Sequence, residues 1–267
     1  MRGLVQLALL LCVSCTSAFV PSTPLPTLGA RTCIQAKQSG VFVPARRTTV
    51  WRMQVDEPEA TESRETNYLR LQVAELASKL RGTNLYFIGM MGSGKSTVAN
   101  EMAKLMRLYS YIDTDLVIEQ LVGMSMHELF EAEGEEAMRD VEMQVLDQVH
   151  SYVKMVVATG GGIVLKKTNW GKLQTGLVIW LDMPVADIAE RLSKNQEELD
   201  KRPLLRGDAA ANLQKIFDER KELYGAADVR VPVSPGDSVE EVVLAVVAGL
   251  EDFIASNPPK WQQWKEQ

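Results

Sequence analysis

Gly89-Met-Met-Gly-Ser-Gly-Lys-Ser-Thr97 fits the pattern G-x-x-x-x-G-K-[ST]. The stretch 84–88 directly before it, Asn followed by four largely apolar residues, predicts a buried strand, and residues 97–106 have the spacing of a helix. A strand, a glycine-rich loop and a helix in this order form the context that a phosphate-binding loop requires. We therefore interpret the stretch as a loop that binds the phosphates of a nucleoside triphosphate, rather than as a glycine-rich turn that matches by chance.

The residue types of this loop explain how it would hold phosphate groups. Glycine tolerates backbone conformations that a Cβ forbids, so successive N–H groups can point at phosphate oxygens. The positive end of the following helix adds to this attraction. Lys95 supplies a positive charge to the outer phosphates, and the hydroxyl of Ser96 is suited to coordinate Mg²⁺. The predicted nucleotide-binding residues of the loop are Gly92, Ser93, Gly94, Lys95, Ser96 and Thr97.

The first 55 residues differ in composition from the rest of the chain. They contain six basic residues and no acidic one. Residues 4–13 form an apolar run of signal-peptide length that is too short to span a bilayer as a helix, and Thr16-Ser-Ala18 is a suitable cleavage site. The acid-free segment that follows has the character of a transit peptide. We expect a signal peptide over residues 1–18, a transit-peptide-like segment over 19–55, and no stable membrane anchor.

The junction between these two segments indicates a destination. Ser17-Ala-Phe-Val-Pro21 resembles the junction in the bipartite plastid presequences of algae whose plastids arose by secondary endosymbiosis. The resemblance implies import into the plastid stroma, and the alternative is a secreted protein. All three cysteines, Cys12, Cys15 and Cys33, lie in the segment expected to be removed, which favours a reducing compartment and excludes a disulfide framework.

The charge balance bears on the class of partner. The whole chain has 29 basic and 35 acidic residues and a formal net charge of −6. Removal of residues 1–55 takes away six basic residues and no acidic one, which leaves a net charge of −12. Because binding to nucleic acids depends on basic groups that neutralise phosphates, this negative net charge argues against a nucleic acid as the main partner.

The remainder of the chain divides into three parts. The composition of residues 56–82 predicts an acidic linker followed by a helix over 68–80. The tail 255–267 carries two prolines and two tryptophans, and we expect the tryptophans either to pack back on the domain or to bind a partner. Between 83 and 254, strands alternate with helices, which predicts one α/β domain with a parallel sheet covered on both faces. The predicted strands are 84–88, 109–112, 154–159, 176–181 and 227–231, and the predicted helices are 97–106, 115–122, 126–152, 185–193, 211–223 and 238–254.

Polar residues follow the predicted strands, at the sheet edge where parallel α/β proteins bind ligands. Asp113 is best placed to hold the Mg²⁺ shell, and Asp115 is expected to face an acceptor hydroxyl, although it could instead cap the helix that begins there. Gly160-Gly-Gly162 permits close approach of a ligand to the backbone, and its alternative is a tight turn. Asp182 stands at the end of the fourth strand.

Six motifs in one order resemble shikimate kinase, over about residues 84–250. This resemblance implies a P-loop kinase fold with a five-stranded parallel sheet, flanking helices and a mobile lid over about 195–210. It also implies ATP-dependent phosphorylation of the 3-hydroxyl of shikimate, with ATP and Mg²⁺ as cofactors, by a chain that we expect to be a monomer. The motifs are Gly-Met-Met-Gly-Ser-Gly-Lys-Ser, Asp113-Thr-Asp115, Glu133-Gly-Glu-Glu-Ala-Met-Arg-Asp-Val-Glu142, Ala158-Thr-Gly-Gly-Gly162, Arg202-Pro-Leu-Leu205 and Glu219-Arg-Lys-Glu-Leu-Tyr224.

The resemblance implies the composition of the acceptor site. Arg139 and Arg220 match the positions that bind the carboxylate of shikimate, and Glu142 resembles the carboxylate that orients Arg139. Asp115 matches the residue that contacts the ring hydroxyls and could act as general base. The implied backbone wall of the pocket consists of Gly160, Gly161 and Gly162.

The resemblance also implies residues that contact the nucleotide. Arg202 falls in the lid, where its charge would stabilise the transferring phosphoryl group, and Arg191 resembles the position that covers the adenine. One residue departs from the family, because Met138 stands where an aromatic side chain usually precedes the carboxylate-binding arginine; we expect altered packing without loss of activity. The implied catalytic residues are Lys95, Asp115 and Arg202.

Two other interpretations compete with an active shikimate kinase. An inactive relative that kept the fold as an interaction module would have a degenerate phosphate loop, but Gly94, Lys95 and Ser96 are intact. A different small-molecule P-loop kinase would need its own acceptor site, and the arginines and Asp115 suit a hydroxylated carboxylate better.

Overall fold

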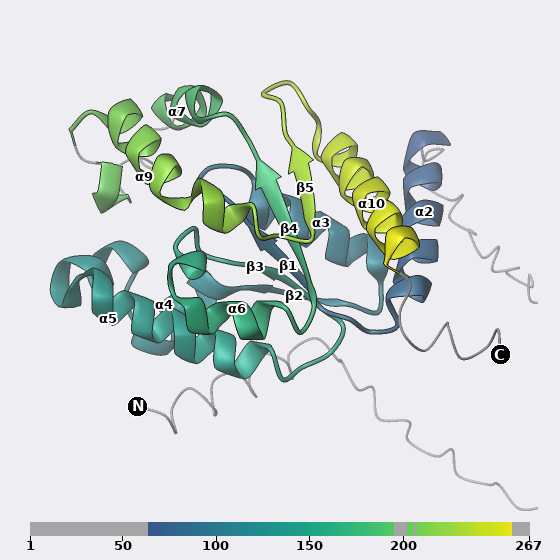
Figure 1. The fold of residues 1–267 in the computed structure, drawn as a ribbon, viewed down its shortest axis with the longest axis horizontal. Coiled ribbons are helices and arrows are strands. Elements are labelled where there is room, and N and C mark those ends of the chain that lie inside the picture. The colour runs from purple at the N-terminus through teal and green to yellow at the C-terminus, as the bar shows by residue number, and fades with distance from the viewer. Residues whose placement is uncertain (1–63, 195–201, 206, 258–267) are drawn as a thin grey trace, which may run out of the picture.

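The computed structural model describes residues 64–194, 202–205 and 207–257. They form a five-stranded sheet in which all neighbouring strands pair in parallel, in the order β2-β3-β1-β4-β5 (Figure 1). β1 and β3 are buried along their whole length because they lie inside the sheet beneath helices on both faces. The strands are β1 Leu85–Ile88, β2 Ser110–Asp113, β3 Met155–Ala158, β4 Leu177–Asp182 and β5 Val229–Pro232.

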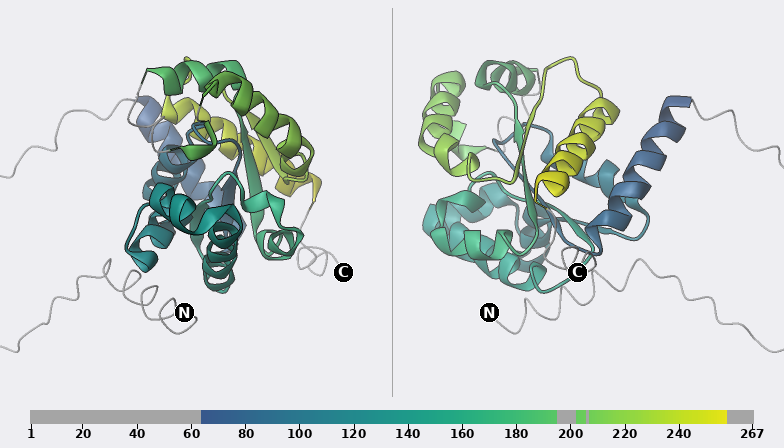
Figure 2. Two further views of the ribbon diagram at one scale, coloured as in Figure 1. Left: turned by 90° about the vertical axis from the view of Figure 1, so that its left-hand side faces the viewer. Right: turned by 45° about the vertical axis from the view of Figure 1, so that its right-hand side comes forward.

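Helices cover both faces of this sheet. α2, α3 and α10 pack against one another on one side, whereas α5, α6 and α9 lie on the other (Figure 2). α4 packs on α5, and α7 on α9. The helices are α2 Arg64–Leu80, α3 Lys95–Met106, α4 Thr114–Val122, α5 Met126–Val149, α6 Lys167–Leu173, α7 Val185–Ser193, α9 Ala209–Tyr224 and α10 Val239–Ser256, with short 3₁₀ turns η1 Ile163–Leu165 and η2 Pro203–Leu205.

The predicted α/β architecture is confirmed, and each predicted strand lies within two residues of an observed one. The predicted helix over 126–152 is wrong in two respects. It ends at Val149, and it is interrupted at Gly134, whose φ of 82° and ψ of 176° break the helical backbone. α6 was not predicted, because only Asn169 and Leu173 of this helix are buried and no apolar period marks it.

The helix predicted before the first strand shares the main hydrophobic core. Leu69, Val73, Leu76 and Leu80 are buried on one face of α2, with the spacing of an amphipathic helix. Lys79 on the same helix forms an ion pair with Glu251 of α10 at 2.7 Å. α2 is therefore packed into the folded unit, and the observed helix begins four residues earlier than predicted.

Several expectations lie outside the described residues. These are the presequence over 1–55, the linker over 56–63, half of the lid over 195–210, and the tail with Trp261 and Trp264. Within the part of the chain that the structure describes, no helix is long and apolar enough to cross a membrane.

Candidate active site

The polar segments after β1, β2 and β3 meet at the carboxyl edge of the sheet, as parallel pairing requires. Two cavities lie there, with volumes of about 110 Å³ and about 380 Å³. The smaller cavity is bounded by the acceptor residues that the family resemblance implied, and the larger by the phosphate loop. Both cavities are lined by Met91, Asp115, Gly161 and Arg202, so they adjoin one another.

The phosphate loop has the backbone that its sequence predicted. Gly89 has a φ of 139°, and a Cβ at this position would lie 2.6 Å from the carbonyl oxygen of Leu181. Only glycine therefore fits between the end of β1 and the neighbouring strand. The larger cavity is lined from this loop by Gly92, Gly94, Lys95, Ser96 and Thr97, whereas Ser93 is buried and does not line it.

Lys95 is buried at the start of α3. Its Nζ donates a hydrogen bond to the carbonyl oxygen of Met90 at 2.8 Å, so the loop itself holds the side chain. Burial lowers the pKa of Lys95 to about 8, because the charged form loses hydration; the carboxylate of Asp115 opposes this shift and the guanidinium of Arg202 adds to it. Anionic phosphates at this position would restore the charged form.

Asp113 ends β2 and caps α4. Its Oδ1 accepts a hydrogen bond from the backbone N–H of Asp115 at 3.0 Å, and its Oδ2 accepts one from the hydroxyl of Tyr111 at 3.2 Å. The alternative that Asp115 caps this helix is therefore wrong. Tyr111 was missed, although its spacing of two residues from Asp113 on a strand could have indicated that both side chains share one face.

Asp115 projects from the first turn of α4 into both cavities. Its Oδ1 is buried and has no hydrogen-bond partner among the described residues. The pKa of Asp115 is raised to about 7, mainly by burial and also by the nearby carboxylates of Glu142 and Asp113, against the opposing charges of Lys95 and Arg139. Its carboxyl group therefore changes protonation state near neutral pH.

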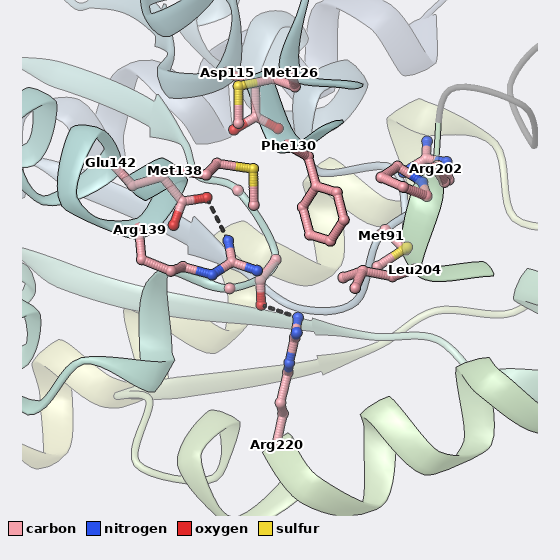
Figure 3. A pocket seen from close by; sticks show the side chains of 14 residues that line it. Met91, Asp115, Met126, Phe130, Met138, Arg139, Glu142, Arg202, Leu204 and Arg220 are labelled. Carbon is pink, nitrogen blue, oxygen red and sulfur yellow. Dashed lines mark hydrogen bonds and ion pairs between the residues drawn. The ribbon is translucent and has the colours of Figure 1, made fainter. Parts of the chain in front are cut away.

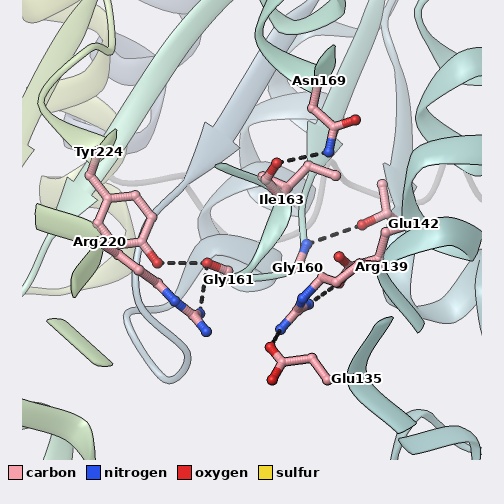
Figure 4. A network of polar contacts seen from close by, with 10 residues as sticks. Glu135, Arg139, Glu142, Gly160, Gly161, Ile163, Asn169, Arg220 and Tyr224 are labelled. Carbon is pink, nitrogen blue, oxygen red and sulfur yellow. Dashed lines mark hydrogen bonds and ion pairs between the residues drawn. The ribbon is translucent and has the colours of Figure 1, made fainter. Parts of the chain in front are cut away.

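Arg139 lies on α5 between two carboxylates. Its guanidinium donates to the buried Glu142 at 2.7 Å and to the half-exposed Glu135 at 2.9 Å (Figure 4). A Cβ on Gly162 would lie 2.1 Å from the Cζ of Arg139, so the guanidinium lies against this stretch of backbone and only glycine leaves it room. The pKa of Arg139 is raised because these carboxylates outweigh its burial.

Arg220 approaches the same cavity from α9. It donates to the carbonyl oxygen of Gly161 at 3.1 Å, and the hydroxyl of Tyr224 donates to the same oxygen at 2.6 Å. The buried Nε atoms of Arg139 and Arg220 and Oε2 of Glu142 have no hydrogen-bond partner among the described residues. Unpaired donors and acceptors therefore surround one small cavity (Figure 3).

The structure brings together the implied acceptor residues, namely Asp115, Arg139, Gly160, Gly161, Gly162 and Arg220, with Arg202 beside them. Met138 lines this cavity too, which agrees with its expected place in the pocket wall. Arg191 lines the larger cavity and donates to the carbonyl oxygen of Gly92 at 3.2 Å. The rest of the apolar wall was not predicted as part of the site; it consists of Met91, Met126, Phe130, Pro203 and Leu204.

Asp182 does not take part in either cavity, although it ends a strand at the same edge. Its Oδ2 accepts a hydrogen bond from Nε of Arg230 at 2.8 Å, and Arg230 lies over the ring of Trp180, with its Cζ 4.8 Å from the ring centroid. The polar residue at this strand end therefore joins β4 to β5.

Comparisons with known proteins agree with this architecture. The shikimate kinase family model matches residues 91–251. The shikimate kinase of Synechococcus elongatus is 43% identical over 188 residues, which cover 69% of this chain and 96% of that protein. The shikimate kinase of Gloeobacter violaceus is 45% identical over 176 residues, which cover 65% of this chain and 97% of that protein.

The fold comparison extends this result to a solved structure. A shikimate kinase from Acinetobacter baumannii in complex with shikimate matches with a TM-score of 0.59 at 28% identity, and the match covers 69% of this chain and 99% of that one. With identities above 40% across nearly the full length of its relatives, and with the matching five-stranded sheet, this chain belongs to the shikimate kinase family.

Proposed function

We propose that this chain transfers the γ-phosphoryl group of ATP to the 3-hydroxyl of shikimate, in the pathway to chorismate and the aromatic amino acids. The observation that carries the proposal is the set of unpaired polar atoms around the 110 Å³ cavity. Two arginine N–H donors suit a carboxylate, and two carboxylate acceptors suit hydroxyl groups. Shikimate carries both kinds of group on one small ring, and the solved shikimate kinase from Acinetobacter baumannii is in complex with shikimate.

The proposed roles follow from the positions of the residues. Arg139 and Arg220 hold the acceptor carboxylate, and the backbone at Gly160, Gly161 and Gly162 forms the wall on which the ring lies. Asp115 orients the acceptor hydroxyl and takes its proton, because a carboxylate with a pKa near neutrality can do both. This pairing of a cationic clamp with a carboxylate fixes the hydroxyl toward the phosphate loop.

The nucleotide side is assigned in the same way. Lys95 and Arg202 place positive charge where the phosphoryl group is transferred, and Arg191 covers the base. Gly92, Ser93, Gly94, Ser96 and Thr97 supply the rest of the phosphate contacts. The hydroxyl of Ser96 and the carboxylate of Asp113 are hard oxygen donors of the kind that Mg²⁺ prefers, and bound Mg²⁺ neutralises phosphate charge.

An assay of ADP release tests the proposed reaction. Residues 56–267 are assayed with ATP, with and without shikimate and with and without Mg²⁺. We expect ADP release that depends on shikimate and on Mg²⁺. Turnover that shikimate does not stimulate would show that the acceptor is wrong, and stimulation by another hydroxylated carboxylate alone would redirect the assignment.

We propose further that residues 1–18 and 19–55 act as a signal peptide and a transit peptide for the plastid stroma, and that the enzyme acts as a monomer. The cyanobacterial origin of the relatives supports a plastid location, because plastids descend from cyanobacteria. The acid-free composition of residues 1–55 supports it as well. Fluorescent fusions of residues 1–55 and of 1–18 in an alga with complex plastids test the location, and light scattering on residues 56–267 tests the monomer.

A further inference from the structure

Tyr111 lies beside both residues that we assign to the Mg²⁺ site. Its hydroxyl donates a hydrogen bond to Oδ2 of Asp113 at 3.2 Å, and it also interacts with the hydroxyl of Ser96. Tyr111 and Asp113 are two residues apart on β2, so both side chains point to the same face of the sheet. One phenol group therefore contacts a residue of the phosphate loop and a residue of the neighbouring strand end.

The donors at this position suit a metal ion that binds through few protein ligands. The structure contains no group of three or more His, Cys, Asp and Glu side chains suited to a metal, within the ranges that it describes. Mg²⁺ at a nucleotide site is held by one or two protein oxygens, by phosphates and by water. When so few protein ligands take part, the orientation of each one has a large effect on affinity.

The carboxylate of Asp113 is held at both oxygens. Oδ1 accepts from the backbone N–H of Asp115 at 3.0 Å, an interaction that belongs to the helix cap. Oδ2 accepts from Tyr111, the one side-chain donor to this carboxylate that the described residues provide. Without the phenol hydroxyl, the carboxylate could rotate about its bond to Cβ, and its free lone pairs would no longer have a fixed direction.

We propose that Tyr111 is a positioning residue for the metal–nucleotide complex, which it favours by fixing the Asp113 carboxylate relative to the Ser96 hydroxyl. The inference rests on the metal site in the proposed function, but not on the identity of the acceptor. Tyr111 would act through Asp113 and Ser96 and would make no bond to the metal. The phenylalanine variant keeps the ring and removes only the hydroxyl.

Tyr109 provides a matched control. It stands two residues earlier, directly before the amino end of β2, where its hydroxyl accepts a hydrogen bond from the backbone N–H of Gly82 at 3.2 Å. Tyr109→Phe removes the same atom as Tyr111→Phe and also costs one hydrogen bond. Tyr109 lines neither cavity at the carboxyl edge. The Tyr109→Phe variant therefore shows how much of any change comes from a loss of stability and not from a loss of metal binding.

The test measures binding without turnover. The affinity of the full chain for ADP is determined with and without Mn²⁺, and free Mn²⁺ is followed by electron paramagnetic resonance. We expect Tyr111→Phe to weaken binding of Mn²⁺–ADP about tenfold and to leave the affinity for metal-free ADP within about twofold. Tyr109→Phe is expected to leave both affinities at the wild-type values.

Three outcomes would overturn the inference. They are unchanged binding of Mn²⁺–ADP by Tyr111→Phe, an equal loss in Tyr109→Phe, and an equal loss for metal-free ADP. If the wild type binds Mn²⁺–ADP no more tightly than ADP, the metal site itself is wrong and the inference fails with it. Because shikimate is absent from this experiment, a failed ADP-release assay would contradict the proposed acceptor and leave this inference standing.

Discussion

The two ends of the same sheet bury polar side chains in opposite ways. At the amino end, the buried Asn84 donates to the carbonyl oxygen of Tyr152 at 2.7 Å and accepts from the N–H of Met155 at 2.9 Å. At the carboxyl end, Asp115, Arg139, Glu142 and Arg220 each keep a buried polar atom that no described residue satisfies. The amino end joins β1 to β3, whereas the carboxyl end leaves donors and acceptors for a ligand.

The physical cost explains the difference. A buried polar group without a partner costs about 1–3 kcal/mol, so a fold tolerates several of them in one place only where something else recovers the cost. At the amino end the protein satisfies its own groups, and these groups contribute to stability. At the carboxyl end a bound ligand would satisfy them, and the same groups contribute to affinity and catalysis.

The largest expected effects come from the two charged groups between the cavities. Lys95→Ala removes the positive charge from the outer phosphates, and Asp115→Asn removes the proton acceptor, so each should lower kcat at least about 10³-fold. Steady-state ADP release with shikimate measures the change, and circular dichroism confirms folding. Near-normal turnover by Asp115→Asn would contradict the role that we assign to this carboxylate.

The carboxylate clamp should affect substrate affinity more than kcat. Arg139→Ala removes a charge-assisted donor and leaves Glu142 without its partner, so we expect the KM for shikimate to rise about 100-fold and kcat to fall much less. Arg230→Ala is the matched control, because Arg230 also pairs with a carboxylate at this edge but lines neither cavity. An equal rise in KM in both variants would show that the effect is not local.

A change at the amino end should alter stability alone. Asn84→Ala deletes hydrogen bonds to Tyr152 and Met155 in a buried position, so we expect a loss of about 2–3 kcal/mol in the free energy of unfolding. Urea unfolding measures the loss, and the KM for shikimate should stay within about twofold of wild type. A large rise in KM without destabilisation would contradict the division between the two ends.

The pH dependence should give the smallest effect, and its sign differs between activity and stability. Because the pKa of Asp115 is raised to about 7, its carboxylate is protonated below that pH, and kcat/KM should fall about tenfold per unit as the pH drops below 7.

Stability should change in the opposite direction. Between about pH 4 and 7, the carboxyl group of Asp115 is protonated in the native state and ionised in the unfolded state. The contribution of this group therefore lowers the free energy of unfolding as the pH rises through that range. Asp115→Asn should therefore unfold at a higher temperature than wild type at pH 8, and this advantage should disappear near pH 4. Scanning calorimetry at both pH values measures it. A lower unfolding temperature at pH 8 would contradict the unfavourable burial of this charge.

Much of the fold could be predicted from the sequence because its signals are local. The strand before Gly89, the helix after Lys95 and the strand before Asp113 depend on residues within a few positions of one another. The errors lie where local signals are weak or are overridden. α6 carries no apolar period, and Gly134 interrupts a helix whose side chains otherwise keep the helical spacing.

The sequence by itself determined that a phosphate loop, two aspartates and a triple glycine would stand at one edge of a parallel sheet, because strand direction and residue spacing leave no other place for them. Only the tertiary structure decided which polar groups remain unpaired there. Asp182 on β4 pairs with Arg230 on the neighbouring strand β5. Arg139 and Arg220 are 81 residues apart on two different helices, and the Nε donor of each has no partner among the described residues. Pairing over such separations depends on how whole helices pack, which no local pattern contains.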